Sequence, residues 1–151
     1  MKIVLILLKL LGVWTVSYLI GAAVSAIYWS AASEIGGVFE WFLEAVAWSF
    51  PVFVLAFTLV YLPSMFGLRW ILGGVKPVMP FPIVGGVLYI VPTAMMFLLY
   101  KSSDWFQAMF SSQNIAFHIM FLAAGILFGL GFVVVLSERA VQALGPDSPV
   151  R

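Results

Sequence analysis

The chain has 151 residues, of which 64% are hydrophobic and 9% are charged, and its net charge at pH 7 is +1. This composition excludes a soluble globular domain, which needs more polar surface, and a nucleic-acid-binding protein, which needs a strong basic field. The lack of cysteine excludes disulfides, thiol chemistry, iron–sulfur clusters and cysteine-based zinc sites.

Four apolar runs predict an all-α membrane protein whose four transmembrane helices form one bundle. A helix needs about 20 apolar residues to cross the hydrocarbon core of a bilayer, so four spans and short connections account for residues 1–151 as a single domain. The first predicted span covers residues 10–29. Residues 3–8 extend this helix, with Lys2 and Lys9 on one helical face where their ammonium groups reach the lipid headgroups.

A short amphipathic helix is predicted in residues 31–47, between the first two spans. Glu40 and Glu44 lie one turn apart in this segment, and most of the surrounding positions are apolar. This pattern is typical of a helix that lies in the membrane interface, here on the outer side. The second span is predicted for residues 48–66, with prolines only near its two ends, so a severe central kink is not expected.

A loop is predicted for residues 67–81, because glycines and prolines interrupt both helical and strand periodicity there. The third predicted span covers residues 82–100 and carries Pro92 near its middle. Proline removes one backbone hydrogen bond, so we expect a kink in which Thr93 or a neighbouring helix satisfies the freed carbonyl.

The fourth predicted span covers residues 115–136, and a short tail, 137–151, follows it and begins with one or two helical turns. In this topology only one of the seven basic residues, Lys101, lies on the side opposite the two termini. An excess of Lys and Arg in short loops marks the cytoplasmic side, so both termini are predicted to be cytoplasmic, in a bacterial inner membrane. The residues on the cytoplasmic side are Lys2, Lys9, Arg69, Lys76, Arg139 and Arg151.

Two stripes of small and polar residues predict close helix packing. In the fourth span, Asn114, His118, Gly125 and Gly129 share one helical face. Small residues four positions apart let a neighbouring backbone approach closely, which is the main device for helix association in lipid. We expect this face to pack against another helix, in this chain or in a partner protein.

The second stripe lies on the first span. Ser17, Gly21 and Ser25 follow one another at intervals of four residues, so they too share a helical face. We expect this face to contact another helix as well. The sequence leaves open whether the two stripes contact each other or a partner.

His118 is the only histidine in the chain and lies about one turn inside the outer end of the fourth span. An ionisable group in a membrane span is a functional candidate, and an imidazole titrates near neutral pH. The structural alternative is a hydrogen bond from this ring to Asn114 or to a backbone carbonyl, which we favour. Met109 and Met120 would suit copper by ligand type, but Met120 points elsewhere on the helix, so no metal site is predicted.

Glu40, Glu44 and Asp104 form a possible polar site on the outer side. The simpler interpretation of the two glutamates is a solvated helix face. The centres of the four spans contain no Asp, Glu, Lys or Arg, so the usual proton relay or substrate counter-ion of a transporter is lacking. One histidine without acids at suitable spacing provides no catalytic set, so no enzyme activity and no cofactor are predicted.

These observations favour a non-enzymatic subunit of a membrane complex that serves as an accessory, assembly or inhibitory protein. The inhibitory class includes immunity-type proteins, which occlude a membrane toxin. The subunit would act by helix packing with another membrane protein or by self-association. The alternative is a small homo-oligomeric channel or transporter. Its pathway would use the face of the third span that carries Gly86, Tyr89, Thr93, Met96 and Tyr100.

Overall fold

The computed structural model describes residues 2–32, 36–76, 78–100, 103–111 and 114–143. Within these ranges all regular secondary structure is helical. Four helical segments are long and apolar enough to cross a membrane, Ile3–Ala32, Val38–Ile71, Pro80–Tyr100 and Ile115–Ser137. The predicted all-α class, with four helices that are long and apolar enough to span a membrane, is therefore confirmed for the described residues.

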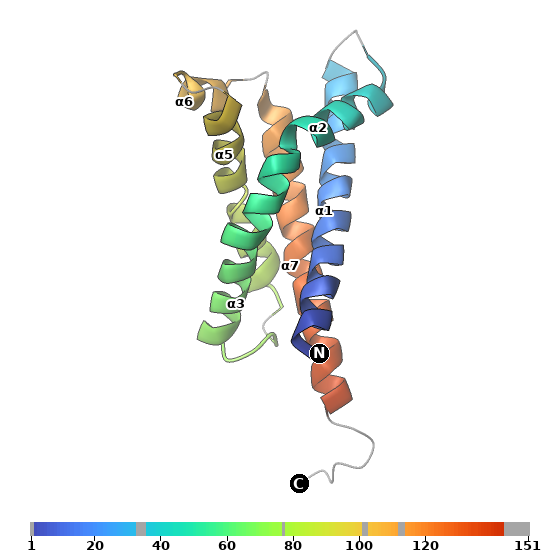
Figure 1. Ribbon diagram of the computed structural model, residues 1–151, viewed down its shortest axis with the longest axis vertical. Coiled ribbons are helices and arrows are strands. Elements are labelled where there is room, and N and C mark those ends of the chain that lie inside the picture. The colour runs from blue at the N-terminus through green and yellow to red at the C-terminus, as the bar shows by residue number, and fades with distance from the viewer. Residues whose placement is uncertain (1, 33–35, 77, 101–102, 112–113, 144–151) are drawn as a thin grey trace.

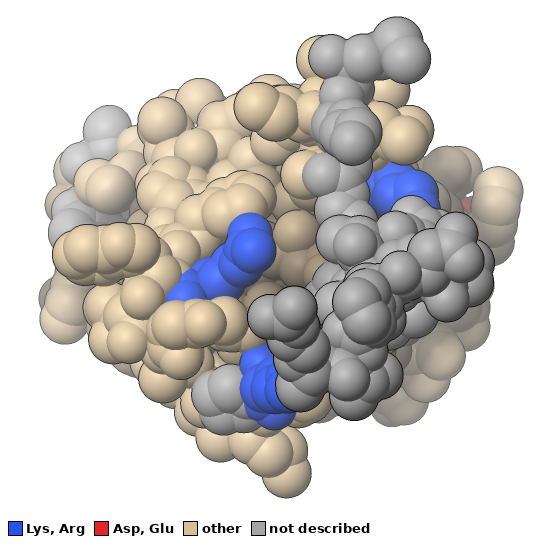
Figure 2. Space-filling model, turned by 90° about the horizontal axis from the view of Figure 1, so that it is seen from below, with Lys and Arg blue, Asp and Glu red and all other residues tan. Residues whose placement is uncertain are grey.

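The first and last helices form the long axis of the bundle. Helix α1 (Lys2–Ala32) is uninterrupted, as expected from the apolar stretch that precedes the first predicted span, and α7 (Ile115–Ala143) lies alongside it (Figure 1). Helix α1 begins and α7 ends at the same end of the bundle (Figure 1). Figure 2 views this end and shows Lys and Arg side chains over it. We call it the basic end.

The second span is longer than predicted and continuous with the helix expected before it. Helix α2 (Val38–Ala56) continues into a π-helical segment, η1 (Phe57–Tyr61), and then into α3 (Leu62–Ile71). Of the amphipathic segment predicted for residues 31–47, residues 38–47 form the first turns of α2, and residues 33–35 lie outside the described part of the chain. Nothing in this stretch stops a helix, and Pro51 lies inside α2 without ending it. Figure 1 shows these first turns crossing over the bundle before α2 turns to run along it.

The connection after α3 is shorter than the predicted loop of residues 67–81. Helix α3 includes Arg69 and ends at Ile71, and α4 (Pro80–Val87) begins two residues before the predicted start of the third span. The end of α3 is set by Gly73, whose φ of 65° is in the left-handed region that favours glycine. Gly74 donates its N–H to the Arg69 carbonyl, and Gly73 donates to the Trp70 carbonyl, which is a Schellman motif.

The predicted kink in the third span is confirmed. The span consists of α4 and α5 (Ile90–Tyr100), which are separated by a turn at residues 88–89. Pro92 has no N–H to give to the Leu88 carbonyl, and that carbonyl accepts the Val91 N–H instead at 3.1 Å. The Thr93 hydroxyl donates to the Tyr89 carbonyl at 2.8 Å, so it satisfies a different carbonyl from the one freed by proline.

A short helix, α6 (Trp105–Met109), lies between α5 and α7 and was not predicted. We call this the α6 end of the bundle, opposite the basic end (Figure 1). Helix α7 continues to Ala143, so the first residues of the predicted tail are helical as expected, and residues 144–151 lie outside the described part of the chain.

The core is built around Trp14 of α1, which is fully buried. Its ring lies 4.5 Å from the Tyr61 ring and 5.4 Å from the Phe128 ring, measured between centroids. Its indole N–H donates to the Phe53 carbonyl at 3.1 Å, one turn before the π-helical segment. This residue therefore joins α1, the second span and α7. Helix α5, in contrast, contacts α2 and α7 only over short stretches, which leaves space near the α6 end.

Candidate functional site

The glycine face of α7 packs against α4 of the same chain. A Cβ atom added to Gly125 would overlap the Gly85 carbonyl, and one added to Gly129 would overlap the Phe81 carbonyl. Both glycines are buried. The predicted close helix contact is therefore present, and its partner is the third span of this chain.

The stripe on α1 does not meet that glycine face. Gly21 is buried against Met120 and Ala124 of α7, where a Cβ would overlap the Met120 carbonyl. Ser25 is buried near the α6 end, and its hydroxyl donates to the Ala22 carbonyl at 2.8 Å. Ser17 faces a groove between α1 and α7. The three residues of this stripe thus have three different surroundings.

His118 has the structural role that we favoured from sequence. Its Nε2 lies 2.7 Å from the Met109 carbonyl oxygen, so the ring connects α7 to the end of α6. The ring lies between Tyr89 and Phe110, at centroid distances of 5.6 and 6.2 Å. Asn114 does not bond to it, because the Asn114 amide donates to the Ala108 carbonyl at 2.7 Å and to the Ser111 hydroxyl at 2.9 Å.

The three acidic residues of the possible polar site do not converge. Glu40 accepts the Gly37 N–H at 3.2 Å and thereby caps the start of α2. Asp104 is exposed just before α6. Glu44 alone lines a pocket. Among the described residues, no group of three or more His, Asp or Glu side chains is placed to hold a metal ion.

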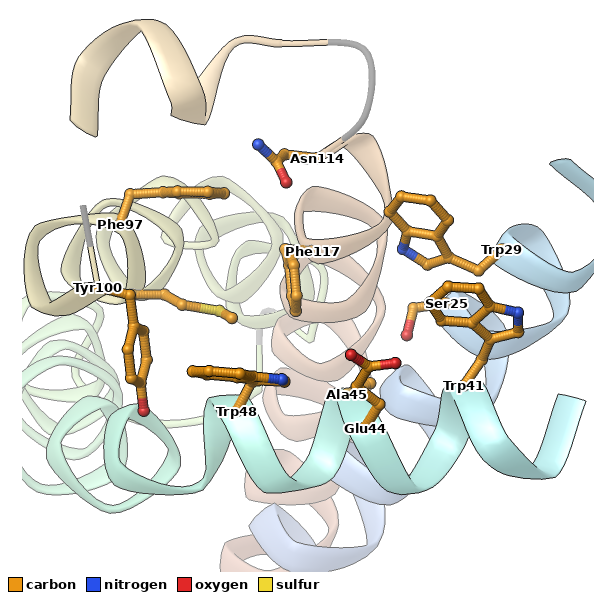
Figure 3. Close-up of a pocket in the computed structure, with 11 residues that line it drawn as sticks. Ser25, Trp29, Trp41, Glu44, Ala45, Trp48, Phe97, Tyr100, Asn114 and Phe117 are labelled. Carbon is orange, nitrogen blue, oxygen red and sulfur yellow. The ribbon is translucent and has the colours of Figure 1, made fainter. Parts of the chain in front are cut away.

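The pocket that contains Glu44 lies at the α6 end and has a volume of about 440 Å³. Helices α1, α2, α5 and the start of α7 surround it (Figure 3). Its walls are mainly aromatic, and we call it the aromatic pocket. The lining residues are Ser25, Trp29, Trp41, Glu44, Ala45, Trp48, Met96, Phe97, Tyr100, Asn114 and Phe117.

Ring contacts hold the walls of the aromatic pocket in place. Trp29 stacks on Trp41 with a centroid distance of 5.1 Å, which joins α1 to α2. Trp48 meets Tyr100 edge to face at 5.1 Å, which joins α2 to α5. Offset or edge-to-face pairs of this kind restrict the rings without filling the space between them. The pocket is therefore a preformed opening between helices.

The polar groups that face this pocket include hydrogen-bond acceptors and hydrogen-bond donors. The Asn114 amide nitrogen is used outside the pocket, and Figure 3 shows its carbonyl oxygen directed inward. The Ser25 hydroxyl proton is used by the Ala22 carbonyl, which leaves the oxygen as an acceptor. The Glu44 carboxylate lies between Trp48 and the Trp29–Trp41 pair (Figure 3). The indole N–H groups and the Tyr100 hydroxyl are donors, and the Trp41 Nε1 is buried without a hydrogen-bond partner in the described structure.

A second concavity, the lateral groove, runs along the outside of the α1–α7 pair. It is lined by apolar side chains around Gly12 and Ser17. A Cβ added to Gly12 would meet no atom within 4 Å, so this glycine is not required by packing inside the chain. The remaining lining residues are Lys9, Val13, Val16, Ile20, Leu127 and Val135.

Ser17 is only 4% exposed, yet its hydroxyl has no hydrogen-bond partner among the described residues. Thr15 and Ser25 on the same helix, in contrast, bond to carbonyls of the preceding turn. An unpaired hydroxyl in a membrane span is unfavourable, because lipid tails offer no acceptor. The lateral groove therefore combines space for close approach with an unused polar group.

Sequence reasoning found Ser25, Glu44 and Asn114 but did not bring them together. It did not connect the tryptophans of the aromatic pocket with a site, and it missed Phe97 and Phe117. The helix bend that carries Trp41 and Trp48 over the end of the bundle has no clear sequence signal. The recurrence of tryptophan at positions 29, 41 and 48, with Glu44 between the last two, was the available clue.

Comparison of the chain with protein-family models, with curated proteins and with solved structures finds no match.

Proposed function

We propose that this chain is a non-enzymatic integral membrane subunit that binds a transmembrane helix of another membrane protein in the lateral groove. It would serve as an accessory, assembly or inhibitory subunit, the last including the immunity type. We place it in a bacterial inner membrane with both termini cytoplasmic, because the basic residues gather at the end where α1 begins and α7 ends. The first turns of α2 then lie at the outer membrane surface.

The observation that carries this proposal is the pairing of Gly12 with Ser17 in the groove. The glycines at positions 21, 125 and 129 are occupied by neighbours in the same chain, so they offer no surface to a partner. Gly12 faces open space, and Ser17 lacks a hydrogen-bond partner within the described structure. A partner helix that approaches closely at Gly12 would bring an acceptor to Ser17, which stabilises association in lipid.

Co-purification and crosslinking in mild detergent test the proposal. Gly12→Leu should abolish recovery of the partner helix protein while leaving the monomer folded, because a side chain at Gly12 meets nothing inside the chain. Gly67→Leu is the matched control, since Gly67 also faces open space but lies on α3. Ser17→Ala should weaken recovery about fivefold, as expected for one interhelical hydrogen bond of about 1 kcal/mol, and Ser30→Ala should not.

Several results would count against this function. A well-behaved monomer without any co-purifying protein would contradict it, as would equal recovery of partner with the Gly12 and Gly67 variants. Recovery of a homodimer that Gly12→Leu dissociates would assign the groove to self-association.

The aromatic pocket favours a second candidate, a small homo-oligomeric channel or transporter. Met96 and Tyr100 belong to the face of the third span that the pathway of a channel would use, and both line this pocket. The inner members of that face are enclosed, because Thr93 is fully buried and Gly86 contacts Ile126 of α7. Liposomes with the purified chain should show ion or solute flux at pH 5.5 or 7.5 if this candidate is correct, and absence of flux at both would exclude it.

A further inference from the structure

The geometry points to a binding site that the lateral groove does not involve: the aromatic pocket binds a protonated organic amine that carries an apolar substituent. Three features define this ligand. They are the charge of the pocket, the direction of its hydrogen-bonding groups and the chemistry of its walls.

The first feature is an uncompensated negative charge. Glu44 is the only charged residue that lines the pocket, and no Lys or Arg of the described chain lines it. The carboxylate lies beside the rings of Trp41 and Trp48 (Figure 3). Aromatic faces carry partial negative charge, so the ring faces among the pocket walls attract a cation as the carboxylate does. A cation is the group that both would attract.

The second feature is the set of acceptors. Glu44 offers two carboxylate oxygens, the Asn114 carbonyl oxygen points inward, and the Ser25 oxygen has its proton engaged elsewhere. A protonated primary amine has N–H donors for these groups. An anion has no donors for these groups and is repelled by the carboxylate, so the pocket discriminates against anions.

The third feature is the apolar, aromatic wall. Hard metal ions require several oxygen ligands at short distance, and a single carboxylate in a space of about 440 Å³ does not supply them. That volume is within the usual range for small organic ligands, whose pockets are mainly apolar with a few placed polar groups. Phe97, Phe117 and Met96 provide the surface for the apolar part of the ligand.

Two ligands of matched shape test the charge preference. 4-Phenylbutylamine and 4-phenylbutan-1-ol differ mainly in the cationic group. Titration calorimetry on the full chain in maltoside micelles should give about tenfold or tighter binding for the amine, because the carboxylate and the aromatic walls both attract its cationic group. Equal binding of the two compounds, or no binding of either, would overturn the proposal.

Matched variants identify the residue. Glu44→Gln keeps the shape of the side chain and removes its charge, so the amine should lose its advantage over the alcohol. Glu40→Gln, one turn away and outside the pocket, should leave the advantage unchanged. If Glu40→Gln has the larger effect, or if Glu44→Gln has none while remaining folded, the assignment is wrong.

Two further measurements distinguish an amine site in the aromatic pocket from the lateral groove and from a lipid-headgroup site. Gly12→Leu should not alter amine binding, so failure of the partner-helix proposal leaves this one intact, and the reverse also holds. In nanodiscs, a phospholipid with an ethanolamine headgroup should not displace the amine more than one with a glycerol headgroup. Selective displacement by the ethanolamine lipid would instead assign the pocket to a lipid headgroup and overturn the small-amine proposal.

Discussion

Gly125 of α7 lies directly against the backbone carbonyl of Gly85 in α4, with no room for a Cβ atom between the two helices. The sequence left open whether the glycine face of α7 packs within this chain or against a partner protein. In the structure it packs within the chain. The fourth span therefore uses its glycine face to hold the kinked third span in the bundle. The surface left for a partner is consequently a different one.

The first prediction follows from this contact. Gly125→Leu should destabilise the isolated chain by several kcal/mol or prevent its folding, because the Gly85 backbone cannot move aside cheaply. Gly12→Leu, where a side chain meets open space, should change thermal stability in detergent by less than about 1 kcal/mol. Membrane insertion should be equal for both, since leucine favours the bilayer. Equal melting temperatures for the two variants would contradict the packing.

The number of long apolar helical segments could be predicted from sequence because each one is a long apolar run. Hydropathy is a property of each residue and its neighbours in the chain, so it can be read without knowing the tertiary structure. The boundaries at Trp48 and Gly67 could not be predicted in the same way. A helix continues past the end of an apolar run until a residue stops it, and the stop after α3 is the left-handed Gly73.

The candidate site was less predictable because a site depends on which helices are neighbours. Periodicity placed Gly125 and Gly129 on one face, but it did not identify Phe81 and Gly85 as their contacts. The aromatic pocket requires the bend in α2, the weak contact of α5 with its neighbours and the ring pairs. These are tertiary properties, so Glu44 could be named from sequence without its surroundings.

The second prediction compares two tyrosines that differ in hydrogen bonding. The Tyr61 hydroxyl is buried and has no partner among the described residues, whereas Tyr18 bonds to the Val46 carbonyl at 3.1 Å and to the Ser49 hydroxyl at 2.7 Å. Tyr61→Phe should leave stability unchanged or raise it by about 1 kcal/mol, because a buried unpaired hydroxyl is removed. Tyr18→Phe should lower it by about 1 kcal/mol, because an interhelical bond is lost.

Thermal unfolding of the Tyr61→Phe and Tyr18→Phe variants in the same detergent measures the two changes in stability. The opposite order, with Tyr61→Phe more damaging than Tyr18→Phe, would show that the Tyr61 hydroxyl has a bonding partner.

The third prediction concerns His118. His118→Ala removes the 2.7 Å contact with the Met109 carbonyl and the ring packing between Tyr89 and Phe110. We expect a loss of about 1 kcal/mol, the usual value of one interhelical hydrogen bond, and faster amide exchange in residues 105–109. Exchange in α1 should be unchanged. If His118→Ala loses more stability than Gly125→Leu, then His118 does more than connect α7 to α6. A functional role for this histidine would then have to be considered again.

The last prediction concerns Trp14, which is fully buried in the core. Trp14→Phe removes the indole N–H, which leaves the Phe53 carbonyl without its cross-helix donor, and it opens a gap between Tyr61 and Phe128. Both effects act at the junction of three spans, so we expect a loss of about 2 kcal/mol. Trp70→Phe is the matched control, because Trp70 is 85% exposed and should lose less than about 0.5 kcal/mol. Thermal unfolding in detergent compares the two variants. If both lose the same amount, Trp14 does not organise the core, and the π-helical segment beside it must be stabilised by other contacts.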